Sequence, residues 1–255
     1  MPETHSSESS GSRPVFGIRP VIEAVEAGKE VDKVMIQRGL QGDLAKQLLR
    51  LLKERNIPFQ TVPLEKLNRL TRKNHQGVFA FLAEVEYASL FQLLPALFES
   101  GRDPLIVVLD RITDVRNFGA IVRSAECLGA HAILLPSRGA SPVGADALKT
   151  SAGALQRIPI CREDNLKRAL SDLKQSGLRL VACTEKAQGV LFEADLTGPL
   201  ALILGSEEDG ISEAYLDLCD ERCAIPMLGQ TASLNVSVSA GIFLAEVIRQ
   251  RGARV

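Results

Sequence analysis

Residues 105–125 read LIVVLDRITDVRNFGAIVRSA and join an apolar run to a segment of helical periodicity. The run 105–110 is almost continuously apolar, which is typical of a strand buried on both faces of a parallel sheet. The residues after it predict a helix over 117–129. A strand that leads through a short loop into a helix is the repeating unit of parallel α/β folds.

The remainder of the chain repeats this alternation of strand and helix. Further strands are predicted at 132–136, 158–161, 178–184, 200–205 and 223–227. Further helices are predicted at 145–155, 164–177, 212–220 and 233–251. Repeated βα units predict an α/β fold with an open, mostly parallel, doubly wound sheet. Ligands of such sheets bind beyond the carboxyl ends of the strands, so functional residues are expected there.

A smaller α/β unit is predicted near the N-terminus, over residues 15–86. Its helices are expected at 20–29, 43–56 and 64–71, and its strands at 31–37, 57–62 and 77–85. Asp43 is a candidate N-cap for the second helix. A unit of about 70 residues is long enough to be a domain of its own.

The segments around these two units complete the predicted organisation. Residues 1–14 are rich in Ser, Glu and Gly, and they predict a disordered tail. Residues 87–103 are interpreted as a linker that is either helical or an irregular connection, and residues 104–255 as the main domain.

The composition excludes several classes of protein. The 255 residues are 45% hydrophobic and carry 30 Lys and Arg against 31 Asp and Glu, so a nucleic-acid partner needs a local basic patch. No apolar run approaches the roughly 20 residues of a membrane span. Five scattered Cys indicate reduced thiols and a cytoplasmic protein. The Cys and His residues are not spaced as the ligands of a metal site would be. Aromatic residues are too few to form a surface on which nucleic-acid bases stack.

The first strand-end segment carries Asp114, Arg116, Asn117 and Arg123. A helix N-terminus with two nearby guanidinium groups is suited to phosphate. Alternatively, Asn117 simply caps the helix and Arg123 pairs with Asp114.

The second segment, GSEEDG, follows the strand at 200–205. Gly205 lacks a Cβ and would let a ligand approach the backbone, while the three acids could accept ribose hydroxyls or a cationic group. A solvated, acid-rich turn before a helix is the alternative.

The third segment runs from Ile225 to the final helix. Ile225, Met227 and Leu228 offer an apolar wall with free backbone groups, which suits a flat heterocycle such as adenine. Ser233 is expected to be the N-cap, with Asn235 in the first helical turn. The alternative is a buried final helix whose small residues allow close packing.

A basic stretch lies within the smaller unit. Residues 66–75 contain Lys66, Arg69, Arg72 and Lys73 and no acid. This stretch either contacts an RNA backbone or is a solvated helix face.

Taken together and in order, the three segments resemble the motifs of the SpoU/TrmH-type RNA ribose 2′-O-methyltransferases of the SPOUT class, over about residues 104–250. NFGAIVRSA from Asn117, GSEEDG from Gly205, and IPMLG with SLNVSV from Ile225 and Ser233 carry the resemblance. FGIRPV from Phe16 and HQGV from His75 resemble the small domain of the subgroup that modifies 23S ribosomal RNA. Arg19 stands where that subgroup usually has His, and Glu208 stands where Gly is common.

The resemblance implies a fold, a donor and an assembly. The fold is a small N-terminal α/β RNA substrate-binding domain and a C-terminal, mostly parallel α/β domain with a deep trefoil knot. The methyl donor is S-adenosylmethionine, and no metal is expected. Two copies of the chain form a homodimer, which does not bind a membrane. Its donor site would be formed by Thr184, Gly205, Ile225, Met227 and Leu234.

The resemblance also implies residue roles. Arg123 would hold the phosphate and the developing oxyanion, because an arginine stays protonated and is a poor base. Asn117 and Glu207 would orient the nucleotide, and Ser233 and Asn235 would hold the ribose or support Arg123. RNA would be contacted by Lys66, Arg69, Arg72, Lys73 and Arg116. The expected substrate is a guanosine of 23S ribosomal RNA, with a transfer-RNA target or an inactive RNA-binding assembly factor as alternatives.

Overall fold

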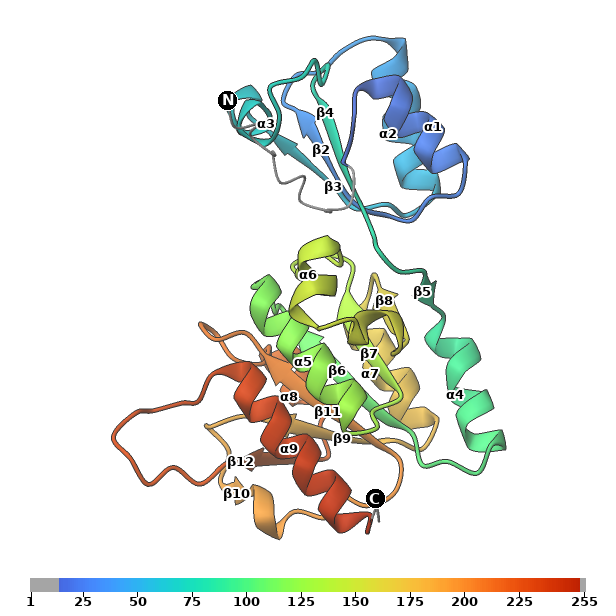
Figure 1. The fold of residues 1–255 in the computed structure, drawn as a ribbon. Coiled ribbons are helices and arrows are strands. Elements are labelled where there is room, and N and C mark those ends of the chain that lie inside the picture. The colour runs from blue at the N-terminus through green and yellow to red at the C-terminus, as the bar shows by residue number, and fades with distance from the viewer. Residues whose placement is uncertain (1–13, 253–255) are drawn as a thin grey trace, which may run out of the picture. The chain divides into compact units, whose positions relative to one another are not determined.

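A computed structural model describes residues 14–252 of the chain. The tail predicted at 1–14 lies, except for Pro14, outside the described residues. The chain divides into two compact units, one formed by residues up to Glu84 with Pro142–Asp146, and the other by Val85–Ser141 and the residues from Ala147 onward. Each unit has a β-sheet and helices of its own (Figure 1). No helix within the described range is long and apolar enough to cross a membrane.

The smaller unit is a four-stranded sheet in the order β1-β4-β2-β3. Strands β2 and β3 are parallel, and β4 runs antiparallel to β1 and β2. Alternate residues of β2 face opposite sides, so Val34 and Ile36 pack under α1 and α2 while Met35 packs against Leu67 of α3. The elements are β1 (Val15–Phe16), α1 (Ile18–Glu26), β2 (Val31–Gln37), α2 (Asp43–Glu54), β3 (Phe59–Val62), α3 (Leu64–Leu70) and β4 (Val78–Leu82).

The larger unit is an eight-stranded sheet in the order β10-β12-β9-β11-β6-β7-β8-β5, and every neighbouring pair is parallel. The predicted parallel α/β fold is therefore confirmed. The strands are β5 (Tyr87–Ala88), β6 (Leu105–Asp110), β7 (Ala132–Pro136), β8 (Ile160–Glu163), β9 (Arg179–Cys183), β10 (Gly189–Val190), β11 (Leu200–Gly205) and β12 (Glu221–Ala224).

Helices cover both faces of this sheet. Helices α4, α7 and α8 pack on the side to which Ile106 and Val108 point. Helices α5 and α9 lie side by side on the other face (Figure 1). The helices are α4 (Leu90–Glu99), α5 (Val115–Cys127), α6 (Ala145–Thr150), α7 (Leu166–Gln175), α8 (Glu213–Leu216) and α9 (Val236–Gln250), with short 3-10 turns η1 (Ala154–Gln156) and η2 (Leu191–Glu193). The trefoil knot stays a prediction.

The strand order places a switch point between β6 and β11. The chain runs outward from β6 through β7 to β8, then crosses to β9 and returns to insert β11 between β9 and β6. Gly205 pairs in register with Asp110, so the carboxyl ends of β6 and β11 lie together. Ligand sites of α/β sheets form at such points.

Several predicted helix ends are wrong, each for a local reason. Helix α5 begins at Val115 and not at 117, because the Asp114 carboxylate accepts from the backbone N–H of Arg116 and Asn117 and is itself the N-cap. The N-cap of α9 is Asn235, not Ser233, since the Asn235 side chain accepts from the Ser237 N–H. Gly42, with φ 111°, takes the N-cap position before Asp43.

Other predicted boundaries also shift. The helix predicted at 145–155 ends at Thr150, and left-handed Gly153 separates it from η1. The last strand spans Glu221–Ala224, not 223–227, and the chain leaves the sheet just before Pro226. Strands β1, β5 and β10 were not predicted, and the segment interpreted as a linker forms β5 and α4 of the larger unit.

Candidate active site

A tight hairpin follows β11 at the switch point. Ser206 and Gly210 form an antiparallel bridge, in which the Gly210 N–H donates to the Ser206 carbonyl at 2.9 Å. A Cβ on Gly205 would collide with the backbone of Gly210 and Ile211. The chain's own return therefore fills the space beside Gly205, which was expected to admit a ligand.

Arg111 fastens this hairpin to the end of β6. Its guanidinium donates to the Asp110 carboxylate at 3.1 Å, to Asp209 at 2.8 Å and to the Gly210 carbonyl at 3.1 Å. The hydrogen bond to Asp110 is the main cause that raises the pKa of Arg111. Asp110 is only 2% exposed and also accepts from the Ser212 hydroxyl and N–H, each at 2.7 Å.

Sequence reasoning missed this role of Arg111. The backbone of Arg111 has φ 59°, a left-handed conformation that is uncommon outside glycine. The only signal in the sequence was an arginine directly after the acid that ends a buried strand.

Three predicted residues from separate motifs form one cluster. Glu207 Oε1 accepts from Asn117 Nδ2 at 2.9 Å and from Asn235 Nδ2 at 2.8 Å. Asn235 Nδ2 also donates to Asn117 Oδ1 at 3.0 Å. Each amide is fixed in orientation because its partners require a donor at one atom and an acceptor at the other. The cluster presents a carboxylate and amide groups at the N-terminal ends of α5 and α9.

A cavity of about 260 Å³ opens beside this cluster, and we call it the β6/β11 cavity. It combines backbone and side chains of the loop after β6, the start of α5 and the hairpin. Its lining residues are Arg111, Ile112, Thr113, Asp114, Asn117, Ser206, Glu207, Glu208, Asp209 and Val236.

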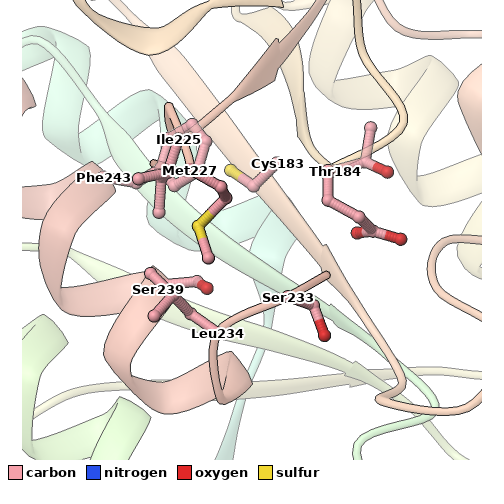
Figure 2. Close-up of a pocket in the computed structure, with 9 residues that line it drawn as sticks. Cys183, Thr184, Ile225, Met227, Ser233, Leu234, Ser239 and Phe243 are labelled. Carbon is pink, nitrogen blue, oxygen red and sulfur yellow. The ribbon is translucent and has the colours of Figure 1, made fainter. Parts of the chain in front are cut away.

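A second, smaller pocket lies where β9 and β12 end and the chain continues to α9, and we call it the loop pocket. It encloses about 50 Å³. Ile225, Met227 and Phe243 lie on one side, facing Leu234 and Ser239 on the other (Figure 2). Cys183, Thr184, Glu185 and Ser233 complete the lining. The structure thus brings together Thr184, Ile225, Met227 and Leu234, four of the five residues predicted to bind the donor, while Gly205 does not line this pocket.

The loop from Pro226 to Leu234 has free backbone groups. All of its residues are exposed. Between Ile225 and Leu234, no backbone N–H or C=O makes a hydrogen bond within the described part of the chain. Because these exposed groups have water and no protein group as their partner, they are available to hydrogen-bond a ligand.

Three predicted site residues lie apart from the Asn117, Glu207 and Asn235 cluster. Arg123 is exposed, lines neither cavity and has no polar partner among the described residues, so the alternative pair with Asp114 does not form. Arg116 is likewise exposed and outside both cavities. Ser233 lines the loop pocket and does not join the cluster.

The basic stretch forms an exposed surface on the smaller unit. Lys66 and Arg69 lie on α3, and Arg72 and Lys73 follow it. All four side chains are exposed, and none forms an ion pair within residues 14–252. Lys73 Nζ lies 5.9 Å from the centre of the Phe16 ring, close enough for a cation–π contact.

The described residues include no group of three or more His, Cys, Asp or Glu that could hold a metal ion. Cys183 and Cys223 are register neighbours on β9 and β12. Burial raises the pKa of Cys223 to about 12 and that of Cys183 well above its ordinary value. These thiols stay protonated near neutral pH and are poor nucleophiles.

The chain matches two family models, both of RNA methyltransferases. The SpoU rRNA Methylase family model matches residues 104–245, and the model for RNA 2′-O ribose methyltransferase substrate binding matches residues 14–88. The chain belongs to the SpoU rRNA methylase family, which confirms the resemblance carried by the three motifs.

Individual relatives agree with this membership. The chain is 36% identical over 237 residues to YacO of Bacillus subtilis, assigned to the TrmH family of tRNA/rRNA methyltransferases, covering 93% of this chain and 95% of that protein. It is 30% identical, with a TM-score of 0.58, to the SpoU methyltransferase AviRb of Streptomyces viridochromogenes in complex with AdoMet, covering 93% and 89%. A solved RNA 2′-O ribose methyltransferase is 28% identical, with a TM-score of 0.54, covering 94% and 89%.

Proposed function

We propose that this protein transfers a methyl group from S-adenosylmethionine to the ribose 2′-hydroxyl of a guanosine in 23S ribosomal RNA, acting as a cytoplasmic homodimer. The observation that carries the proposal is the hydrogen-bonded cluster of Asn117, Glu207 and Asn235 beside the β6/β11 cavity. Residues 15–86 would form the RNA-binding domain, using the exposed Lys66, Arg69, Arg72 and Lys73.

The residues of the loop pocket suit the chemical groups of the methyl donor. S-adenosylmethionine carries an adenine ring, a ribose and a methyl group activated by a sulfonium sulfur. Ile225, Met227 and Leu234 supply an apolar wall, and the free backbone groups of the 226–234 loop supply hydrogen bonds to a heterocycle. A space of about 50 Å³ holds only a few water molecules. Part of a bound donor would therefore lie outside this space, against the exposed 226–234 loop.

The chain's contribution to the reaction is positioning and charge stabilisation. The 2′-oxygen must lose its proton as it bonds to the methyl carbon, while the carbon–sulfur bond breaks and leaves a neutral thioether. Asn117 and Asn235 hold the Glu207 carboxylate beside the cavity, where it can accept a hydrogen bond from a ribose hydroxyl. The released proton goes to an RNA phosphate oxygen or to water, since arginine stays protonated.

Arg123 forms no hydrogen bond or ion pair within the described residues of one chain. Its side chain is exposed and lies outside both cavities. In the homodimer that we propose, Arg123 of one copy would reach the β6/β11 cavity of the other, where it would hold the phosphate and the developing oxyanion.

Ribose methylation maps test the proposed target directly. Ribosomal and transfer RNA are compared from cells with and without this gene, and from cells that carry Asn235→Asp in its place. One guanosine of 23S ribosomal RNA is expected to lose its methyl group in both mutant strains. A mark lost only from transfer RNA would move the target to that RNA, and no lost mark in either RNA would favour an assembly factor without activity.

A further inference from the structure

The two faces of the sheet in the smaller unit are covered unequally. Helices α1 and α2 pack over one face, and the short α3 lies over the other (Figure 1). Among the residues of α3, Leu67 is the one that is buried, and it packs with Phe79. A helix of seven residues is only about 10 Å long, so α3 leaves part of this face uncovered.

Three phenylalanines stand together on the face that α3 covers in part. Phe16 of β1 and Phe79 of β4 are register partners, and their ring centres are 6.4 Å apart. Phe81 lies two residues further along β4, on the same face, with its ring centre 5.0 Å from that of Phe79. Phe79 is buried, whereas Phe16 and Phe81 are partly exposed. The sheet thus gathers three of the nine Phe of the chain, which the low overall aromatic content does not reveal.

A lysine lies beside each of the two partly exposed rings. Lys33 of β2 is the register partner of Phe81, and the side chains of such a pair point to the same face. Lys73 Nζ lies 5.9 Å from the centre of the Phe16 ring. Neither ammonium group forms an ion pair within the described residues. We call Phe16, Phe81, Lys33 and Lys73 the aromatic face, and it is continuous with the basic stretch through Lys73.

Aromatic rings with neighbouring cations are suited to unpaired nucleotides. The bases of a single strand stack on aromatic side chains, and cations attract the phosphates between them. The bases of an RNA double helix are already stacked on one another, so a double helix offers chiefly its backbone and its 2′-hydroxyls. The match of residues 14–88 to a model for RNA substrate binding is an independent indication that the ligand of this unit is RNA.

Resting on the proposed function, we propose that the aromatic face binds unpaired nucleotides of the RNA substrate, with one base stacked on Phe16 and another on Phe81. Lys33 and Lys73 contact the phosphates next to these bases. The basic stretch attracts any RNA through its backbone, whereas the aromatic face favours RNA that is single-stranded. The smaller unit thereby directs the protein to unpaired segments of its substrate.

Affinities for two RNA probes test this role in the full-length protein. One probe is a labelled single strand of about 12 nucleotides, and the other is the duplex that it forms with its complement. The double variant Phe16→Leu/Phe81→Leu should bind the single strand about tenfold more weakly, because the stacking surface is lost. Its affinity for the duplex should stay within about twofold of the wild-type value.

Phe59→Leu is the matched control for the loss of an aromatic ring. Phe59 is a partly exposed phenylalanine of the same sheet, but it packs on the side of α1 and α2. Both affinities should therefore stay at the wild-type values in this variant. Thermal unfolding verifies that each variant is folded.

A fluorescence signal tests the stacking itself and does not depend on the double variant. The chain contains no Trp, so a single introduced Trp is the only indole that reports. Phe81→Trp keeps a large aromatic ring, should bind the single strand as the wild type does, and should lose emission when a base stacks on the indole. The emission of Phe59→Trp should change little upon binding of the same unlabelled strand.

The outcomes separate the aromatic face from the proposed function. Unchanged single-strand affinity in Phe16→Leu/Phe81→Leu, or unchanged emission of Phe81→Trp in the complex, would overturn the aromatic face and leave the proposed function standing. Equal loss of affinity for both probes would also overturn it, since that loss does not depend on unpaired bases. Failure of the folded wild type to bind either probe or 23S ribosomal RNA would overturn the proposed function, and the aromatic face with it.

Discussion

Asn235 donates through Nδ2 to Oδ1 of Asn117 at 3.0 Å, although the two residues are 118 positions apart in the chain. The contact ties the first residues of α5 to the N-cap of α9, where these two helices pack side by side. Both amides then orient the Glu207 carboxylate. Three motifs that are distant in the sequence thereby become one site.

Asn235 has two roles that substitution can separate. Its Oδ1 caps α9 by accepting from the Ser237 N–H at 2.9 Å, while its Nδ2 donates to the cluster. Asn235→Asp keeps the cap but puts a second carboxylate oxygen beside Glu207 in place of the donor, so methyl transfer should fall about 100-fold and repulsion between the two carboxylates should lower stability. Asn235→Ala loses both and should also be destabilised by about 1 kcal/mol. Thermal unfolding measures the effect on stability, and single-turnover kinetics measure the effect on methyl transfer. A wild-type rate in Asn235→Asp would show that the cluster has no part in the mechanism.

Co-expression of two inactive variants tests whether Arg123 acts on the active site of the partner copy. Arg123→Ala and Asn235→Ala are expected to be inactive separately. If Arg123 acts across the dimer, co-expressed chains form heterodimers with one intact site, and transfer should recover to about one quarter of the wild-type rate. Activity of the mixture that stays at the level of the separate variants, in verified heterodimers, would show that Arg123 does not act on its partner's site.

The basic stretch should contribute the salt-dependent part of RNA binding. The variant in which Gln replaces Lys66, Arg69, Arg72 and Lys73 should have a less negative slope of the logarithm of the RNA association constant against the logarithm of salt concentration. The slope should change by about 3 if each residue contacts one phosphate. The replacement should raise KM more than it lowers kcat. Filter binding to 23S ribosomal RNA at several salt concentrations gives the slope.

The matched control is a second set of four exposed cations in the same unit, on and next to α2: Lys46, Arg50, Lys53 and Arg55. Their replacement by Gln should change the slope less, since Lys46 and Arg50 already pair with Asp43 and Glu54. Equal slopes for both quadruple variants would mean that the basic stretch is ordinary solvated surface.

Buried thiols should make the fold sensitive to alkaline pH. Burial raises the pKa of Cys161 and of Cys223 to about 12, from an ordinary value of 9.0. Above pH 9 the unfolded chain loses these protons while the folded chain keeps them, so stability falls by about 1.4 kcal/mol per pH unit for each thiol. Urea unfolding should show that the free energy of unfolding of the double variant Cys161→Ala/Cys223→Ala falls less between pH 9 and 10 than that of the wild type. The control Cys127→Ala, which changes an exposed thiol, should match the wild type.

The parallel sheet could be predicted from local sequence, and so could the edge of the sheet where Asn117 and Glu207 lie, while the choice of these two residues and of Asn235 came from the resemblance carried by the three motifs. A run such as LIVVLD at 105–110 has no polar face and must be buried on both sides, and chemistry in such sheets lies where the strands end. The position of Arg111 could not be predicted in this way. Its role depends on a left-handed backbone and on a hairpin that lies nearly a hundred residues later, and neither leaves a local pattern.

The N-caps of the helices also could not be predicted from local sequence alone. Ser233 and Asn235 are both good capping residues, and the sequence offers no means to choose between them. Tertiary structure decides, because Asn235 alone meets Asn117 and Glu207 while it caps α9. Short edge strands such as β10 (Gly189–Val190) are defined only by their neighbours in the sheet.

The most direct measurement supplies the purified protein with S-adenosylmethionine labelled in the methyl group, together with RNA from cells that lack the gene. The RNA is then digested to nucleosides, and the labelled product is identified. We predict that the label appears in 2′-O-methylguanosine with the wild type and is lost with Asn235→Asp. Label on a base, or no label in RNA from a folded protein that binds the donor, would contradict ribose methylation by this site.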